Sequence, residues 1–136
     1  MQLNPYLNFN GQCEAAFRFY EQCFGGRIIA MSPFEGSPME TEVPPEWRGK
    51  ILHARMQVGS VLLMGGDELP EDYEAPRGFN VTLGIDEAAE AERVFAALAE
   101  NGLMRMPLQE TFWAVRFGMV TDRFGIPWMI NCEKSA

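Results

Sequence analysis

The stretch that decides the fold is residues 77–102, which read RGFNVTLGIDEAAEAERVFAALAENG. Its first part alternates apolar with polar or small side chains, which is the period of a half-buried strand. Asp86 is suited to cap a helix running through about Glu100, and Asn101-Gly102 is a typical helix stop. The stretch therefore predicts a strand followed directly by a helix.

The same order of elements occurs near the start of the chain. An extended segment, Leu3 to Phe9, precedes a helical pattern that closes at Gly25-Gly26. Matching residues recur at one constant spacing: Asn4 with Asn80, Leu7 with Leu83, Glu14 with Glu90, Phe19 with Phe95 and Gly26 with Gly102. This self-similarity predicts an internal duplication.

Three further strands are expected in each half. Their ranges are 27–34, 50–58 and 61–64, with Gly59-Ser60 as a tight hairpin, and then 103–110, 112–121 and 126–132. The predicted fold is α+β, a single domain over 1–136 built from two βαβββ repeats, at about 1–67 and about 77–136. Their sheets are expected to form a curved, mixed half-barrel with the helices on its outer face and a ligand cleft between the halves.

Composition limits the partners. The 136 residues carry a net charge of −8, which argues against nucleic acid and anionic membranes. Much of the acid lies in two Pro-bearing stretches, 35–46 and 67–74, which read as solvated loops or as lids. No membrane-spanning run or secretory signal is visible, and three unpaired cysteines fit reduced thiols, so we expect a cytoplasmic protein.

Several phrases resemble a known family. They are Pro5-Tyr6-Leu7, Glu14-Ala15-Ala16, Phe24-Gly25-Gly26, Met106 to Gln109, Thr111-Phe112-Trp113, Arg116 to Gly125 and Trp128 to Asn131. Together they resemble the PhnB-like branch of the vicinal oxygen chelate superfamily, which includes glyoxalases, bleomycin resistance proteins and dioxygenases. The resemblance implies a small-molecule site and a homodimer.

Members of this branch are often labelled demethylubiquinone methyltransferases, a label that we reject for this chain. No strand leads into a glycine-rich turn with an acidic residue about twenty positions on, as a nucleotide-type methyl donor site needs. Phe24-Gly25-Gly26 follows a predicted helix instead.

The resemblance also bears on metal. In enzymatic relatives a divalent ion is held through His, Glu or Gln from equivalent strands. The resemblance places Pro5 at the first such position here, or Asn4 or Tyr6 after a shift of one residue, and it places Asn80 and Met129 at the others. These are poor ligands, so we expect no cofactor. A divalent metal at a non-standard site, such as His53 with Asp67 or Glu110, stays open.

The candidate ligand-binding residues come mainly from strands. Alternation puts His53 and Arg55 on one side of the third strand. With Arg116 from the matching strand they would orient the polar end of a ligand; the alternative is a half-exposed histidine and two structural salt bridges. Tyr6, Asn80, Phe112 and Trp113 complete the set, with core packing as the alternative for Trp113.

Three functions follow as hypotheses. The favoured one is a small-molecule binding protein of vicinal oxygen chelate type that lacks the usual metal-ligand set. The second is a metal-dependent lyase, isomerase or dioxygenase with unusual ligands. The third is a structural or partner-binding domain.

Overall fold

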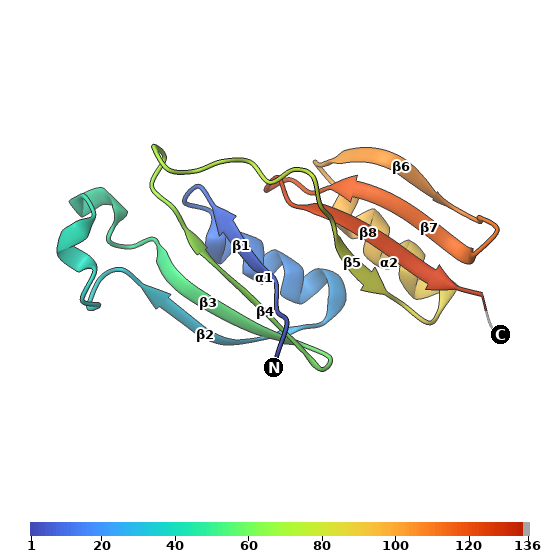
Figure 1. The fold of residues 1–136 in the computed structure, drawn as a ribbon, viewed down its shortest axis with the longest axis horizontal. Coiled ribbons are helices and arrows are strands. Elements are labelled where there is room, and N and C mark those ends of the chain that lie inside the picture. The colour runs from blue at the N-terminus through green and yellow to red at the C-terminus, as the bar shows by residue number, and fades with distance from the viewer. Residues whose placement is uncertain (135–136) are drawn as a thin grey trace. The chain divides into compact units, whose positions relative to one another are not determined.

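The computed structural model describes residues 1–134 and divides into two compact units, Met1–Glu74 and the residues from Ala75 onward (Figure 1). The first unit contains β1 (Tyr6–Phe9), α1 (Cys13–Phe24), β2 (Arg27–Pro33), two 3-10 turns (Glu40–Glu42 and Pro45–Trp47), β3 (Ile51–Val58) and β4 (Val61–Asp67). The second contains β5 (Val81–Gly84), α2 (Ala88–Ala99), β6 (Leu103–Gln109), β7 (Ala114–Thr121) and β8 (Pro127–Glu133). The prediction of two βαβββ repeats in an α+β fold is confirmed.

Both sheets have the same topology. Their strand orders are β1-β4-β3-β2 and β5-β8-β7-β6, with the first strand of each repeat parallel to the last and the others antiparallel. Tyr6 lies opposite Met64, and Thr82 lies opposite Met129. Met64 and Met129 therefore take equivalent places in the two repeats.

Four strand boundaries differ from the predictions by two residues or more. β1 begins at Tyr6 rather than Leu3. β4 continues to Asp67 rather than ending at Met64, because Asp67 still pairs with Phe9. β5 begins at Val81, later than the predicted Arg77. β7 begins at Ala114 rather than Phe112, because Thr111 closes a turn with Ala114: its N–H donates to the Ala114 carbonyl and its hydroxyl accepts from the Ala114 N–H, both at 3.0 Å.

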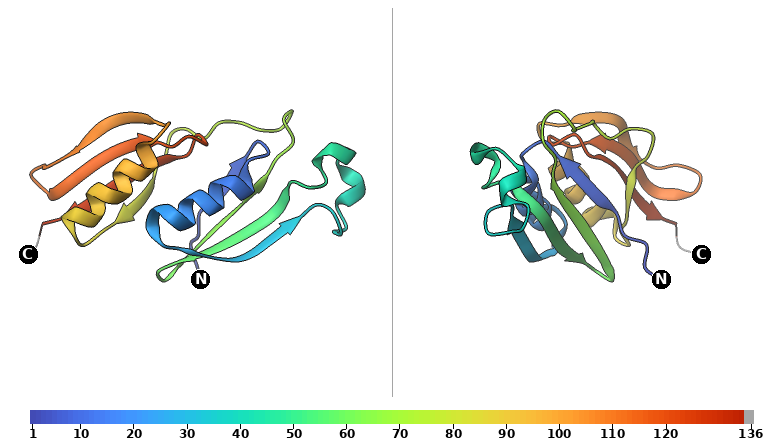
Figure 2. Two further views of the ribbon diagram at one scale, coloured as in Figure 1. Left: turned by 180° about the vertical axis from the view of Figure 1, so that it is seen from behind. Right: turned by 60° about the vertical axis from the view of Figure 1, so that its left-hand side comes forward.

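In each unit the helix covers one face of its own sheet (Figure 2). α1 buries Cys13, Ala16, Phe17, Tyr20 and Cys23, and α2 buries Ala91, Val94, Phe95 and Leu98. A Cβ at Gly65 would lie 2.8 Å from the Phe17 ring, and one at Gly118 would lie 2.8 Å from the Phe95 ring. Glycine is thus required beneath each helix, and these contacts identify which face of each sheet the helix covers.

Phe17 and Phe95 each lie over a glycine, but the two glycines are on strands that do not correspond: Gly65 is on β4, and Gly118 is on β7, which matches β3. The sequence comparison had aligned Phe95 with Phe19, which is less buried than Phe17. The buried residues of the two helices do not coincide at the spacing that relates the first strands, because packing on the sheet and not chain distance decides which residues face inward. The three cysteines are buried, and within residues 1–134 no disulfide joins them.

No helix within residues 1–134 is long and apolar enough to cross a membrane.

Candidate functional site

The face of the N-terminal sheet opposite α1 carries several polar side chains; we call it the open face. Ala54 and Met56 are fully buried on the helix side of β3. His53 and Arg55 alternate with them and therefore lie on the open face, as predicted from the sequence. Tyr6 on β1 alternates in the same way with buried Leu7 and joins them there.

Tyr6 and His53 stack on this face. Their ring centroids are 5.8 Å apart and their planes differ by 22°. Gly66 makes the arrangement possible, since a Cβ there would lie 2.8 Å from the Tyr6 hydroxyl. That hydroxyl donates to the Leu52 carbonyl at 3.5 Å. Burial, followed by the electrostatic effects of Cys13, Glu68 and Asp67, raises the pKa of Tyr6, so its phenol stays a neutral donor near pH 7.

Arg55 is exposed and borders a hollow of about 410 Å³, which we call the N-terminal hollow. Asn4, Gln57 and Leu62 also line it. Within residues 1–134 the Arg55 guanidinium makes no hydrogen bond or ion pair. The structure therefore brings together Tyr6, His53 and Arg55 of the predicted residues and leaves the arginine available for an anion.

Arg116 lies on the face of its sheet that a helix covers, and not on an open face as a ligand-binding role would require. It is two residues before Gly118 on β7 and so shares the face that α2 covers. Its Nε donates to Glu92 Oε1 of α2 at 2.9 Å, and its Nη1 donates to the Val115 carbonyl at 2.8 Å. The alternative raised for this residue, a structural salt bridge, is therefore what the structure contains, and its partner is a glutamate of α2.

Phe112 and Trp113 were expected on a strand and instead lie in the turn before β7. Trp113 is 44% exposed and Phe112 is 88% exposed, so core packing of Trp113 is excluded. The two rings meet edge to face with centroids 4.7 Å apart, and Trp113 also packs on Phe117 at 5.2 Å. Trp128, by contrast, is only 1% exposed and donates to Asp122 Oδ2 at 2.8 Å.

Asn80 contacts a residue that the sequence reasoning missed. Its Oδ1 accepts a hydrogen bond of 2.7 Å from Nη2 of Arg105 on β6. Arg105 lies where the β6–β7 register shifts between Met104 and Met106, so simple alternation could not place it. The first repeat has a corresponding register shift between Ile28 and Ala30, which is likewise visible only in the structure.

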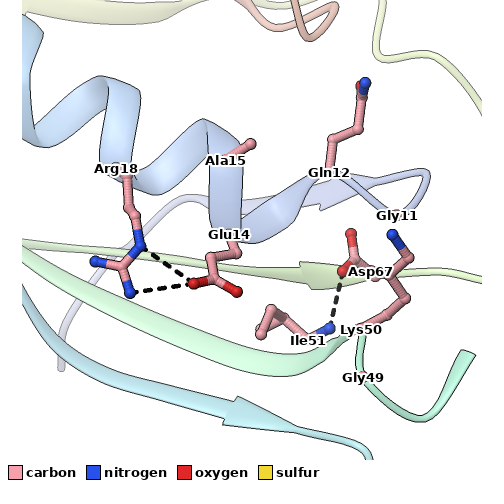
Figure 3. A pocket seen from close by; sticks show the side chains of 9 residues that line it. All are labelled: Gly11, Gln12, Glu14, Ala15, Arg18, Gly49, Lys50, Ile51 and Asp67. Atoms are coloured by element: carbon pink, nitrogen blue, oxygen red, sulfur yellow. Dashed lines mark hydrogen bonds and ion pairs between the residues drawn. The ribbon is translucent and has the colours of Figure 1, made fainter.

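Asp67 is a second residue whose role was missed. It is 6% exposed, with Oδ1 accepting from the Cys13 N–H at 2.9 Å and Oδ2 accepting from the Ile51 N–H at 2.8 Å. Figure 3 shows it beside the start of α1, where a hollow of about 420 Å³ opens. Two basic side chains border this hollow. Arg18 is paired with Glu14, and Lys50 lies over the Trp47 ring.

The arrangement does not fit a metal site that combines His53 with Asp67. Asp67 lies on the helix side of the sheet with both oxygens bonded to backbone, whereas His53 lies on the open face. Glu110 forms an ion pair with Lys134, at 3.7 Å. The equivalent methionines Met64 and Met129 are thioethers, which the usual divalent ions of these enzymes bind poorly. Within residues 1–134 no group of three or more His, Cys, Asp or Glu is placed to hold an ion.

Comparison with known proteins identifies the family. The family model of the glyoxalase, bleomycin resistance protein and dioxygenase superfamily matches residues 2–130. The chain belongs to this superfamily. A curated relative is protein YjdN of Escherichia coli (strain K12), which is 35% identical, with 98% of this chain and 97% of YjdN covered.

Two solved structures share this fold. Protein PA1353 from Pseudomonas aeruginosa is 51% identical with a TM-score of 0.90, covering 99% of both chains. A PhnB protein from Bacillus cereus, described as a putative 3-demethylubiquinone-9 3-methyltransferase, is 22% identical with a TM-score of 0.82, covering 97% of this chain and 99% of that one. At that identity the likeness shows the fold alone.

Proposed function

We propose that this protein binds a small organic anion on the open face of its N-terminal sheet, without the metal-ligand set that superfamily enzymes use. The observation that carries the proposal is the Arg55 guanidinium, which has no partner within residues 1–134 and shares one face of β3 with His53. An uncompensated cation beside a hollow suits a carboxylate or phosphonate group.

Each residue has a distinct role in the proposal. Arg55 donates charge-assisted hydrogen bonds to the anionic group of the ligand. His53 donates or accepts one further hydrogen bond, and its position allows general acid or base chemistry if the ligand is transformed. Tyr6, stacked on His53, limits the rotation of the imidazole and gives the ligand an aromatic contact.

A titration with variants tests this proposal. We expect phenylphosphonate to bind the wild-type chain by isothermal calorimetry and Arg55→Gln to weaken that binding by about tenfold, the value of a charge-assisted hydrogen bond of about 1.4 kcal/mol. Arg93→Gln is the matched control, because Arg93 is paired with Glu90 on the exposed side of α2. Equal weakening in both variants would assign the effect to net charge and contradict the site.

We further propose that the protein acts in the cytoplasm as a homodimer. Phe112 and Trp113 support the second copy, since such exposed neighbouring aromatic rings are typical of surfaces that a partner buries. The cysteines are buried and form no disulfide within residues 1–134, which suits a reducing compartment.

Light scattering after size exclusion tests the dimer. We expect twice the chain mass for the wild type and a shift toward one chain for Trp113→Ser. Met39→Ser serves as the control, because Met39 in the N-terminal unit is equally exposed at 44%. A wild-type monomer, or a dimer that both substitutions leave intact, contradicts the proposal.

A further inference from the structure

The C-terminal unit contains a hollow of its own, of about 320 Å³, which we call the C-terminal hollow. Its place in the second repeat matches that of the N-terminal hollow in the first. The cross-strand pair Gln57 and Leu62 lines the N-terminal hollow, and the pair Thr121 and Pro127 from the equivalent strands lines the C-terminal one. The internal duplication has thus placed a hollow at the same corner of each sheet.

The two hollows differ in charge. The C-terminal hollow is bordered by two arginines, Arg77 and Arg105, and by no acidic residue. Within residues 1–134 neither arginine forms an ion pair, although the acidic stretch 67–74 ends close to Arg77 in sequence. Two uncompensated guanidinium groups on one small hollow repel each other, and a bound anion would remove that repulsion.

Arg105 is held in position before any ligand arrives. Its Nη2 donates to Asn80 Oδ1 at 2.7 Å and to the carbonyls of Val120 and Trp128, each at 3.2 Å. These bonds use one nitrogen, so Nε and Nη1 stay available within the described chain. Because a guanidinium only donates, the oxygen of Asn80 must face Arg105, which leaves the Asn80 NH₂ as a further donor on the hollow.

Phe79 gives the hollow an apolar side. It is 50% exposed and borders the hollow next to Asn80. A flat apolar group can lie against this ring while its anionic end meets the arginines. We infer that the C-terminal hollow is a second ligand site, independent of the open-face site, for a small organic anion with a flat apolar part, such as an aromatic phosphonate or carboxylate.

The experiment is a titration of the full chain with phenylphosphonate, followed through its backbone amide resonances. We expect saturable shifts at Gly78, Asn80 and Thr121. Arg77→Gln and Arg105→Gln should each weaken this binding by about tenfold. Arg93→Gln, which removes the same charge from the exposed side of α2, should leave it unchanged.

Two further arms keep the outcomes distinct. The amide of Gln57 reports on the open-face site, so Arg55→Gln should weaken the affinity read there by about tenfold and leave the affinity read at Gly78 and Thr121 unchanged. Inorganic phosphate should bind the C-terminal hollow more weakly than phenylphosphonate; equal binding would contradict the role of Phe79. If Arg105→Gln unfolds, Arg77→Gln decides, because the Arg77 side chain makes no bond within residues 1–134. Absent shifts at the three reporter amides, or shifts that Arg77→Gln retains at full affinity, overturn the inference.

Discussion

Replacing Asp67 by asparagine should destabilise the protein strongly although the side chain keeps its shape. The carboxylate ties β4 to the first residue of α1 and to the first residue of β3 through two backbone N–H groups. An amide retains one acceptor oxygen and turns an NH₂ group toward the other N–H, so one bond is lost and two donors face each other in a buried place. Losing a hydrogen bond to a charged group and leaving a buried donor unpaired together give a loss of about 2–4 kcal/mol in the free energy of unfolding.

Equilibrium unfolding in urea, followed by circular dichroism, measures this loss. Asp72→Asn is the matched control, since Asp72 is exposed in the following turn; its effect should stay within about 0.5 kcal/mol. Amide hydrogen exchange adds a local readout: relative to the wild type, Asp67→Asn should speed exchange at the start of α1 more than at the start of α2. If Asp67→Asn is no less stable than Asp72→Asn, the Asp67 carboxylate does not hold the first residues of α1 and β3 in the way that the structure indicates.

Three other predictions follow from particular side chains. Arg116→Gln should leave phenylphosphonate affinity unchanged and lower stability by less than about 1 kcal/mol, because the side chain of Arg116 bonds only the exposed Glu92 carboxylate and the carbonyl of its neighbour Val115. Weaker binding in calorimetry would return Arg116 to the site. The folded chain should resist alkylation by iodoacetamide at all three cysteines, because they are buried. Burial, followed by the nearby charges of Asp67 and Glu14, also raises the pKa of Cys13, which lowers the fraction of reactive thiolate. Rapid labelling without denaturant, detected by mass spectrometry, would be inconsistent with this. The raised pKa of Tyr6 favours the folded state while the phenol is protonated. This stabilisation is complete below the ordinary pKa of about 10 and is lost as pH rises through the raised pKa of the folded state. The unfolding free energy of the wild type relative to Tyr6→Phe should therefore fall above pH 10, and a constant difference would disprove this.

The repeats could be predicted because their signals are local. Alternation in residues 77–85 and glycines after both helices determine strand and helix without tertiary information. β3 was oriented correctly for the same reason, since its polar residues His53 and Arg55 alternate with Ala54 and Met56. On β7 the alternation of polar and apolar residues does not show which face is buried, because Phe117 and Met119 on one face are as apolar as Val120 on the other. Nothing in the sequence then says which face α2 covers, so Arg116 was assigned to the wrong side.

The missed residues depend on contacts distant in sequence. Asp67 reads as the start of an acidic loop, and only its contact with the N–H of Cys13 reveals a buried cap. Arg105 lies at a register shift that breaks the two-residue period. Trp113 was moved off its predicted strand by the turn that Thr111 closes. Each case requires knowing which segments meet, which periodicity does not provide.

The most direct test of the central proposal is a phenylphosphonate titration of chain dialysed against a chelator, read at the backbone amides of His53, Arg55 and Gln57. The open-face site predicts saturable shifts at these three residues that are the same with and without added divalent metal. Shifts that appear only after metal is added, or none at millimolar probe, would contradict an anion site that works without the superfamily's metal ligands.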